Sequence, residues 1–97
     1  MEDLLIDIKK DLREHPVVIS LSGYLDSSNY YKIVEAMDDL LNGGYFYLIY
    51  SMKDLEYLSS AGISVIIETL DKLKAKGGDL KLTEVSPRVH KVIELCG

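Results

Sequence analysis

The sequence predicts a single α/β domain, residues 1–97, with a mainly parallel sheet of about four strands, an antiparallel strand at one edge, and three packed helices. Short segments with apolar residues at every second position alternate along the chain with longer segments whose apolar residues recur at helical spacing. A length of 97 residues, of which 47% are hydrophobic, is also enough for one packed core. Because strand–helix–strand connections build parallel sheets, this order of elements predicts a mainly parallel one.

The first two segments predict a hairpin at the edge of the sheet. Leu4, Ile6 and Ile8 alternate with the charged Asp7 and Lys9, as in a half-exposed edge strand. Residues 11–15 are polar and predict a turn. Pro16 has no backbone N–H to donate to a sheet, so it favours the start of the second strand, residues 17–25.

A helix and a central strand are expected next. Asp26, Ser27 and Ser28 are residue types that cap helices, and the apolar residues between 30 and 41 recur at helical spacing. The run Asn42-Gly43-Gly44 ends this helix. Residues 45–50 form a continuous apolar and aromatic run, which predicts a central strand buried on both faces.

The second half of the chain predicts a helix, a strand and a final helix. Residues 58–62 predict a short loop of mainly small residues, and a helix beginning near Gly62 runs to Gly77-Gly78. Residues 79–85 predict the last strand. Ser86-Pro87, a capping residue followed by proline, predicts the start of the last helix.

Two loops follow the carboxyl ends of predicted parallel strands, residues 26–28 and 58–62. Functional loops of such sheets gather at that edge, so we expect these two loops to be neighbours in space.

The second loop contains Ser59 and Ser60 at the expected start of a helix. Free amides at a helix start favour negative charge, and a serine hydroxyl there would be exposed and accessible to a kinase. The alternative is that both serines only cap the helix. Gly62 permits either a close approach of the backbone or dihedral angles that a side chain forbids.

Seven tyrosines are many for a chain of this length. Tyr30 fits the apolar stripe of its helix and is expected in the core. Tyr24, Tyr31 and Tyr57 lie near the two loops, and for them both core packing and contact with a partner are open.

From Val17 to Gly97, the chain resembles the STAS family, whose best-known members are bacterial anti-sigma factor antagonists. The resemblance rests on the order and spacing of several short segments. These are Leu21-Ser22-Gly23-Tyr24-Leu25-Asp26, Leu58-Ser59-Ser60-Ala61-Gly62-Ile63, Gly77-Gly78-Asp79-Leu80-Lys81-Leu82 and Val85-Ser86-Pro87-Arg88-Val89.

The resemblance implies a protein-binding switch with no active site and no cofactor of its own. It makes Ser60, less favourably Ser59, the serine that an anti-sigma factor with kinase activity would phosphorylate, and a phosphatase would reverse this. Asp26 matches an aspartate beside that serine in the family. The implied partner surface comprises Asp26, Ser27, Ser59, Ser60, Ala61, Gly62 and Ser64.

Three positions depart from the family pattern. Ser59 stands where many members carry an acidic residue, and Ser51 stands where many carry an aspartate at the end of the central strand. The family usually continues with a further strand and helix beyond the position that matches Gly97.

Composition argues against several other classes of function. A formal net charge of −5 makes nucleic acid a poor partner, and no apolar run is long enough to span a membrane. His15 and His90 have no metal ligands at suitable spacing, and the lone Cys96 is expected to be a small buried apolar residue. We therefore expect a cytoplasmic protein without metal, as a monomer or weak dimer.

Two alternative functions stay open at this point. One is a STAS interaction module in a signalling scaffold or a transport complex, without sigma-factor control. The other is a nucleotide- or metabolite-binding domain, or a hydrolase that uses Ser60, although no oriented base for it is evident in the sequence.

Overall fold

The computed structural model of the chain describes residues 4–10 and 16–96, without the side chains of the last two. The turn predicted at 11–15, including His15, and the burial predicted for Cys96 lie outside the described residues. The elements in chain order are β1 (Leu4–Lys9), β2 (Val17–Leu25), α1 (Tyr31–Asn42), β3 (Tyr47–Leu58), α2 (Ser60–Ala75), β4 (Asp79–Thr83) and α3 (Pro87–Cys96).

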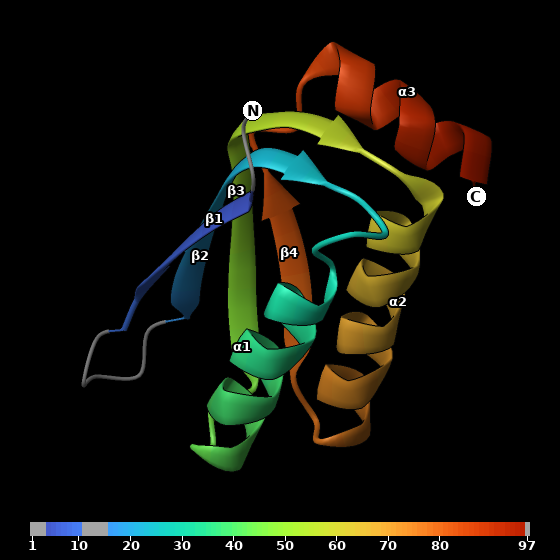
Figure 1. The fold of residues 1–97 in the computed structure, drawn as a ribbon. Coiled ribbons are helices and arrows are strands. Elements are labelled where there is room, and N and C mark those ends of the chain that lie inside the picture. The colour runs from blue at the N-terminus through green and yellow to red at the C-terminus, as the bar shows by residue number, and fades with distance from the viewer. Residues whose placement is uncertain (1–3, 11–15, 97) are drawn as a thin grey trace.

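The strands form a four-stranded sheet in the order β1-β2-β3-β4. β1 pairs antiparallel with β2, whereas β2, β3 and β4 are parallel to one another. This confirms the predicted fold class. α1 and α2 cover one face of the sheet, and α3 lies at the end toward which β4 runs (Figure 1).

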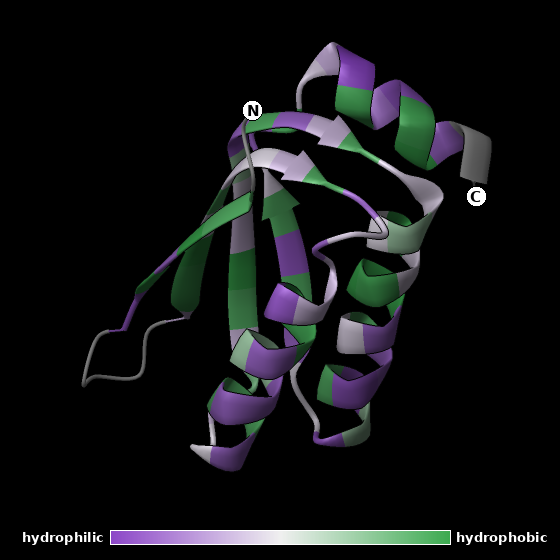
Figure 2. Ribbon diagram, in the orientation of Figure 1, coloured by the Kyte–Doolittle hydropathy of each residue, from purple (hydrophilic) through white to green (hydrophobic). Residues whose placement is uncertain are grey.

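The core lies between the sheet and the helices. The odd-numbered residues of β2 from Val17 to Leu25 are buried against the helices, as period-two alternation requires. Within α1 and α2 hydrophobic and hydrophilic residues alternate, as expected for helices with one buried side (Figure 2).

Tyr50 lies at the centre of this core. Its side chain is fully buried, and its hydroxyl makes no hydrogen bond to the described residues. The neighbouring Thr69 hydroxyl donates to the carbonyl of Val65 at 2.8 Å. Burial raises the pKa of the Tyr50 phenol well above its ordinary value.

The central strand begins later and is longer than predicted, since β3 spans Tyr47–Leu58 and the predicted segment 45–50 overlaps only its first four residues. Tyr47 is 59% exposed, so the expected burial on both faces is wrong at this position. The pairing of β2 with β3 shifts register between Ser20 and Ser22 and again between Gly23 and Tyr24, and each shift inserts one extra residue in β3. The buried side of the second half therefore falls at Met52, Leu55 and Leu58, a spacing that does not alternate by two. Ser51 consequently lies within the strand, opposite Ser20 and Thr83, and not at its end.

The other ends of the predicted elements differ less. β4 ends at Thr83 and not at Val85, because Glu84 adopts a left-handed conformation with φ of 55° that breaks the strand. α3 begins at Pro87 as predicted, and the Ser86 hydroxyl accepts a hydrogen bond from the Val89 N–H at 3.2 Å.

Candidate functional site

The two candidate loops leave the sheet side by side. Leu25 and Leu58, the last residues of β2 and β3, are partners in the parallel register. The N–H of Ser59 then donates to the carbonyl oxygen of Leu25 at 3.0 Å. This bond joins the two loops directly and confirms that they are neighbours.

The first loop is a turn stabilised by side chains. Asp26 Oδ1 accepts hydrogen bonds from the Ser28 N–H at 2.9 Å and from the Ser28 hydroxyl at 2.6 Å. Asn29, only 4% exposed, accepts from the Asp26 N–H at 3.0 Å and donates to the Tyr24 carbonyl at 2.7 Å. Sequence reasoning missed Asn29, although an asparagine in the turn that follows a strand is a common turn former.

The expectation that residues 26–28 cap the first helix is wrong. α1 begins at Tyr31, and its N-cap, Tyr30, provides no side-chain hydrogen bond. Asp26, Ser28 and Asn29 instead make side-chain hydrogen bonds within the turn. Tyr30 is also 41% exposed, so its predicted place in the core is wrong as well.

The second loop is shorter than predicted, because α2 begins at Ser60 and not near Gly62. Ser59 is the N-cap in an extended conformation, and its hydroxyl accepts a hydrogen bond from the Gly62 N–H at 3.3 Å. Ser60 is the first helical residue and its side chain is exposed. The two serines therefore differ: Ser59 caps the helix and is half-buried, whereas Ser60 faces the solvent.

Gly62 allows the start of α2 to pack directly onto the ends of two strands. A Cβ atom at this position would lie 2.6 Å from Leu58 Cδ1 and 2.7 Å from Leu25 Cγ. Gly62 is not among the residues with positive φ, so close approach is the reason for glycine here. The glycine itself is buried.

The remaining residues of the predicted surface lie at the start of α2 and on the first loop. Ser64, one helical turn further along α2, is exposed, and Ala61 between them is half-buried. On the other loop Ser27 is exposed and Asp26 is half-buried. The structure thus brings the predicted residues to one end of the sheet.

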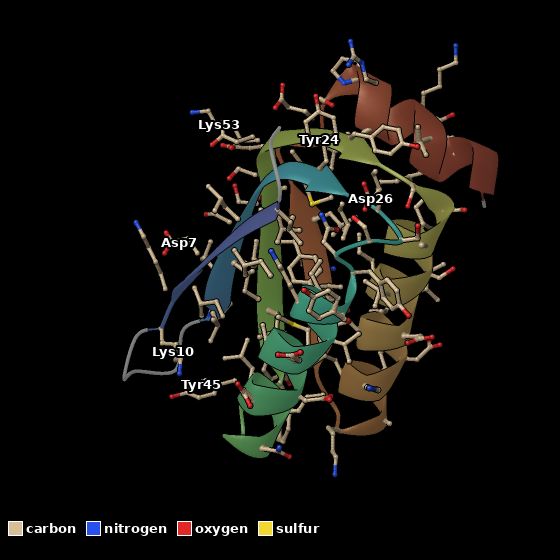
Figure 3. All side chains as sticks on the ribbon, viewed as in Figure 1. Asp7, Lys10, Tyr24, Asp26, Tyr45 and Lys53 are labelled. Carbon is tan, nitrogen blue, oxygen red and sulfur yellow. The ribbon has the colours of Figure 1, made fainter. Side chains whose placement is uncertain are left out.

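An aromatic pair adjoins the two loops. Tyr24 and Tyr57 are opposite each other in the register of β2 and β3, their ring centroids are 6.3 Å apart, and they are 40% and 45% exposed. Figure 3 shows Tyr24 and Asp26 at the same end of the molecule, near the start of α2. Partly exposed tyrosines beside small polar residues are typical of surfaces that bind proteins.

The described residues give no support for a metal site or a membrane-spanning helix. Nowhere in 4–10 and 16–96 do three or more His, Cys, Asp or Glu side chains gather so as to hold a metal ion. None of the described helices has the length and apolar character needed to cross a bilayer.

The comparisons of this sequence with a family model and with a curated protein agree with each other. The sequence model of the STAS domain family matches residues 7–97. A curated protein of Paenibacillus polymyxa, named anti-sigma F factor antagonist, is 25% identical over 95% of this chain and 80% of its own length.

Solved structures share the fold. An anti-sigma factor antagonist from Mycobacterium paratuberculosis aligns with a TM-score of 0.84 at 20% identity, over 98% of this chain and 79% of its own. The phosphorylated form of the Bacillus cell fate determinant SpoIIAA aligns with a TM-score of 0.74 at 22% identity, over 96% and 84%.

Proposed function

Because the chain belongs to the STAS domain family, we propose that it is an anti-sigma factor antagonist. In this role it binds an anti-sigma factor and so releases a sigma factor for transcription. The name of the Paenibacillus polymyxa relative, which matches nearly the whole chain, supports this assignment. The protein is then a ligand and a substrate of its partners and needs no catalytic residues of its own.

The proposed docking surface is the end of the sheet where the two loops meet. The observation that carries it is the exposed side chain of Ser60 at the first residue of α2, next to the Asp26 turn. Ser27 and Ser64 extend this polar surface, and the tyrosine pair borders it. Small side chains at its centre let a partner approach the backbone closely.

We further propose that phosphorylation of Ser60 switches the protein off. Ser60 is the better acceptor, because the Ser59 hydroxyl caps α2 and is half-buried. A phosphate on Ser60 sits well at a helix start, where free amides point outward, so the fold tolerates it.

The same phosphate opposes binding. An anti-sigma factor that docks on the unmodified serine would have to desolvate a dianion without a matched cation, at a cost of about 2–5 kcal/mol. At about 1.4 kcal/mol per tenfold, affinity falls roughly thirtyfold to several-thousandfold. The proposed kinase is the anti-sigma factor itself, and a phosphatase restores the binding form.

Calorimetric titration against the anti-sigma factor kinases encoded in the same genome tests the proposal. Ser60→Ala should bind as tightly as the native chain, whereas Ser60→Asp should bind at least about tenfold more weakly. Ser64→Asp is the matched control: it adds the same charge one helical turn away and should weaken binding less.

Two results would contradict the proposal. If none of these kinases binds the native chain, the assignment as an antagonist is wrong. If Ser60→Asp binds as tightly as Ser60→Ala, the surface or the switch is placed wrongly. Mass spectrometry of the chain after incubation with the kinase and ATP distinguishes Ser60 from Ser59 as the modified residue.

A further inference from the structure

The face of the sheet opposite α1 and α2 carries a row of three paired residues near the ends of β2 and β3. Leu5, Ser22 and Asp54 are partners in the register of β1, β2 and β3. The next row toward the loops is the pair Tyr24 and Tyr57. The odd-numbered residues of β2 are buried against the helices, so its even-numbered residues, and the partners beside them, project from the opposite face.

This row lines a hollow of about 720 Å³, together with Gly23, Lys53 and Glu56. Both register shifts between β2 and β3 adjoin the hollow, and the extra residues bend β3 there. Gly23, with φ of 94°, has no side chain to fill the space. The residues that line the hollow all belong to β1, β2 and β3.

The charges around the hollow favour a cation. Asp54 and Glu56 contribute two carboxylates, against the one ammonium group of Lys53. The Lys53 side chain extends away from the strands, so its charge lies away from the floor of the hollow (Figure 3). Asp54 forms no ion pair with any residue in 4–10 and 16–96. A positively charged group of a binding partner therefore complements this surface.

Large apolar and aromatic side chains border the hollow and stay exposed. Leu5 is 70% exposed, and the stacked pair of Tyr24 and Tyr57 is exposed to almost half on each ring. Exposed side chains of this kind, gathered at one place, mark a surface that binds another protein. Arginine suits both parts of this surface, because its planar guanidinium stacks on aromatic rings and donates to carboxylates, whereas lysine offers a point charge.

We propose that the hollow and the tyrosine pair bind an arginine side chain of a partner protein. Under the function proposed above, on which this part of the inference rests, that partner is the anti-sigma factor. The guanidinium lies against the ring of Tyr24 and donates to the carboxylates of Asp54 and Glu56, and the aliphatic part of the arginine covers Leu5.

This arginine site is separate from the proposed switch at Ser60. Ser60 begins α2, which covers one face of the sheet, whereas the hollow opens on the other face. Tyr57 and Ser59 are separated by one residue, so a single partner can contact both places. The phosphate on Ser60 then decides whether the partner binds, and the hollow decides which partner is recognised.

Calorimetric titration against an anti-sigma factor kinase that binds the native chain tests the site. Asp54→Lys, which repels the arginine, should weaken binding at least about tenfold. Tyr24→Ala should weaken binding at least about fivefold, whereas Tyr24→Phe keeps the ring and should bind like the native chain. Circular dichroism verifies that each variant is folded.

Asp39→Lys is the matched control. Asp39 is exposed on the last turn of α1, at the other end of the molecule from the two loops (Figure 1). This variant makes the same change of charge and should bind like the native chain. Arginines of the kinase replaced one at a time by glutamate then identify the partner residue: one such variant should bind Asp54→Lys at least about tenfold more tightly than it binds the native chain.

A second measurement needs no kinase. In an NMR titration with N-acetyl-argininamide, the backbone amide signals of Ser22, Gly23 and Asp54 should shift. N-acetyl-lysinamide should bind at least about threefold more weakly. The shifts should disappear in Asp54→Lys and persist in Asp39→Lys.

The outcomes separate this inference from the proposed function. If a kinase binds the native chain but binds Asp54→Lys and Tyr24→Ala equally well, the arginine site is overturned and the antagonist role stands. If no kinase binds, the antagonist role fails, and shifts with N-acetyl-argininamide that Asp54→Lys abolishes still support the site. Shifts that are absent, or that Asp54→Lys leaves unchanged, overturn it.

Discussion

At the residue scale, Gly62 and Ser59 decide how α2 begins. Both could be predicted as important from the sequence, because a capping residue and a glycine flank a helix start. That Ser59 caps the helix while Gly62 allows close packing could not be predicted. The close packing depends on Leu25 and Leu58, which approach Gly62 only after β2 and β3 have paired. The exposure of Ser60 and the partial burial of Ser59 follow from the same packing.

Replacement of Gly62 by alanine should destabilise the fold. The added methyl group would meet two leucine side chains at 2.6 and 2.7 Å, and relief of such overpacking costs about 1–3 kcal/mol, against about 1 kcal/mol gained from the better helix former. Urea denaturation should show a lower midpoint. Ser64→Ala, at an exposed position of the same helix, should change stability by less than about 0.5 kcal/mol. A Gly62→Ala protein as stable as the native one would refute this account of the glycine.

Replacement of Tyr50 by phenylalanine should stabilise the fold. The change keeps the ring and removes a buried hydroxyl that makes no hydrogen bond to the described residues, which is worth about 1 kcal/mol at neutral pH.

The difference in stability between Tyr50→Phe and the native protein should grow above about pH 10, the ordinary pKa of tyrosine. Since the folded state raises the pKa of Tyr50, the unfolded chain loses this proton first, and the native protein loses stability as pH increases. Chemical denaturation from pH 8 to 11 measures the difference. Tyr31→Phe, on a ring that is 50% exposed, should follow the native protein. A constant difference between Tyr50→Phe and native protein over this range would count against the burial argument.

At the scale of elements, the order of strands and helices was predictable, whereas the second half of β3 was not. Lys53, Asp54 and Glu56 interrupt the apolar pattern, and two register shifts move the buried side. Alternation detects regular strands only, and a bulge depends on the partner strand, which a single segment does not reveal. The start of α1 was misplaced for a similar reason, because Asp26 and Asn29 bond within the turn and leave the helix without a side-chain cap.

The turn between β2 and α1 should depend on Asn29. Asn29→Ala leaves the Asp26 N–H and the Tyr24 carbonyl without their side-chain partner, which costs about 1–3 kcal/mol. Thermal unfolding measures this loss. Ser28→Ala removes only an exposed contact to Asp26 and should change stability by less than about 0.5 kcal/mol. Equal effects of the two variants would show that the buried amide does not stabilise the turn.

At the scale of the whole molecule, the fold class and the meeting of the two loops followed from the parallel topology alone. Carboxyl ends of neighbouring parallel strands must reach the same edge, whatever the details of each strand. The structure also has an apolar groove beside β4, which could not be foreseen, because Ile67, Leu82 and Ile93, which line it, come from separate elements and share a surface only once α2 and α3 are packed. Composition does not distinguish such a surface from the core.

The hydrogen bond from the Ser59 N–H to the Leu25 carbonyl affects how much the two loops can change shape when a partner binds. It ties both loops to the sheet itself, so little chain entropy remains to be lost when another molecule docks there. Recognition at this end should therefore resemble the fit of two rigid bodies. A covalent change on Ser60 would then alter the charge of a fixed shape, without first having to remodel it.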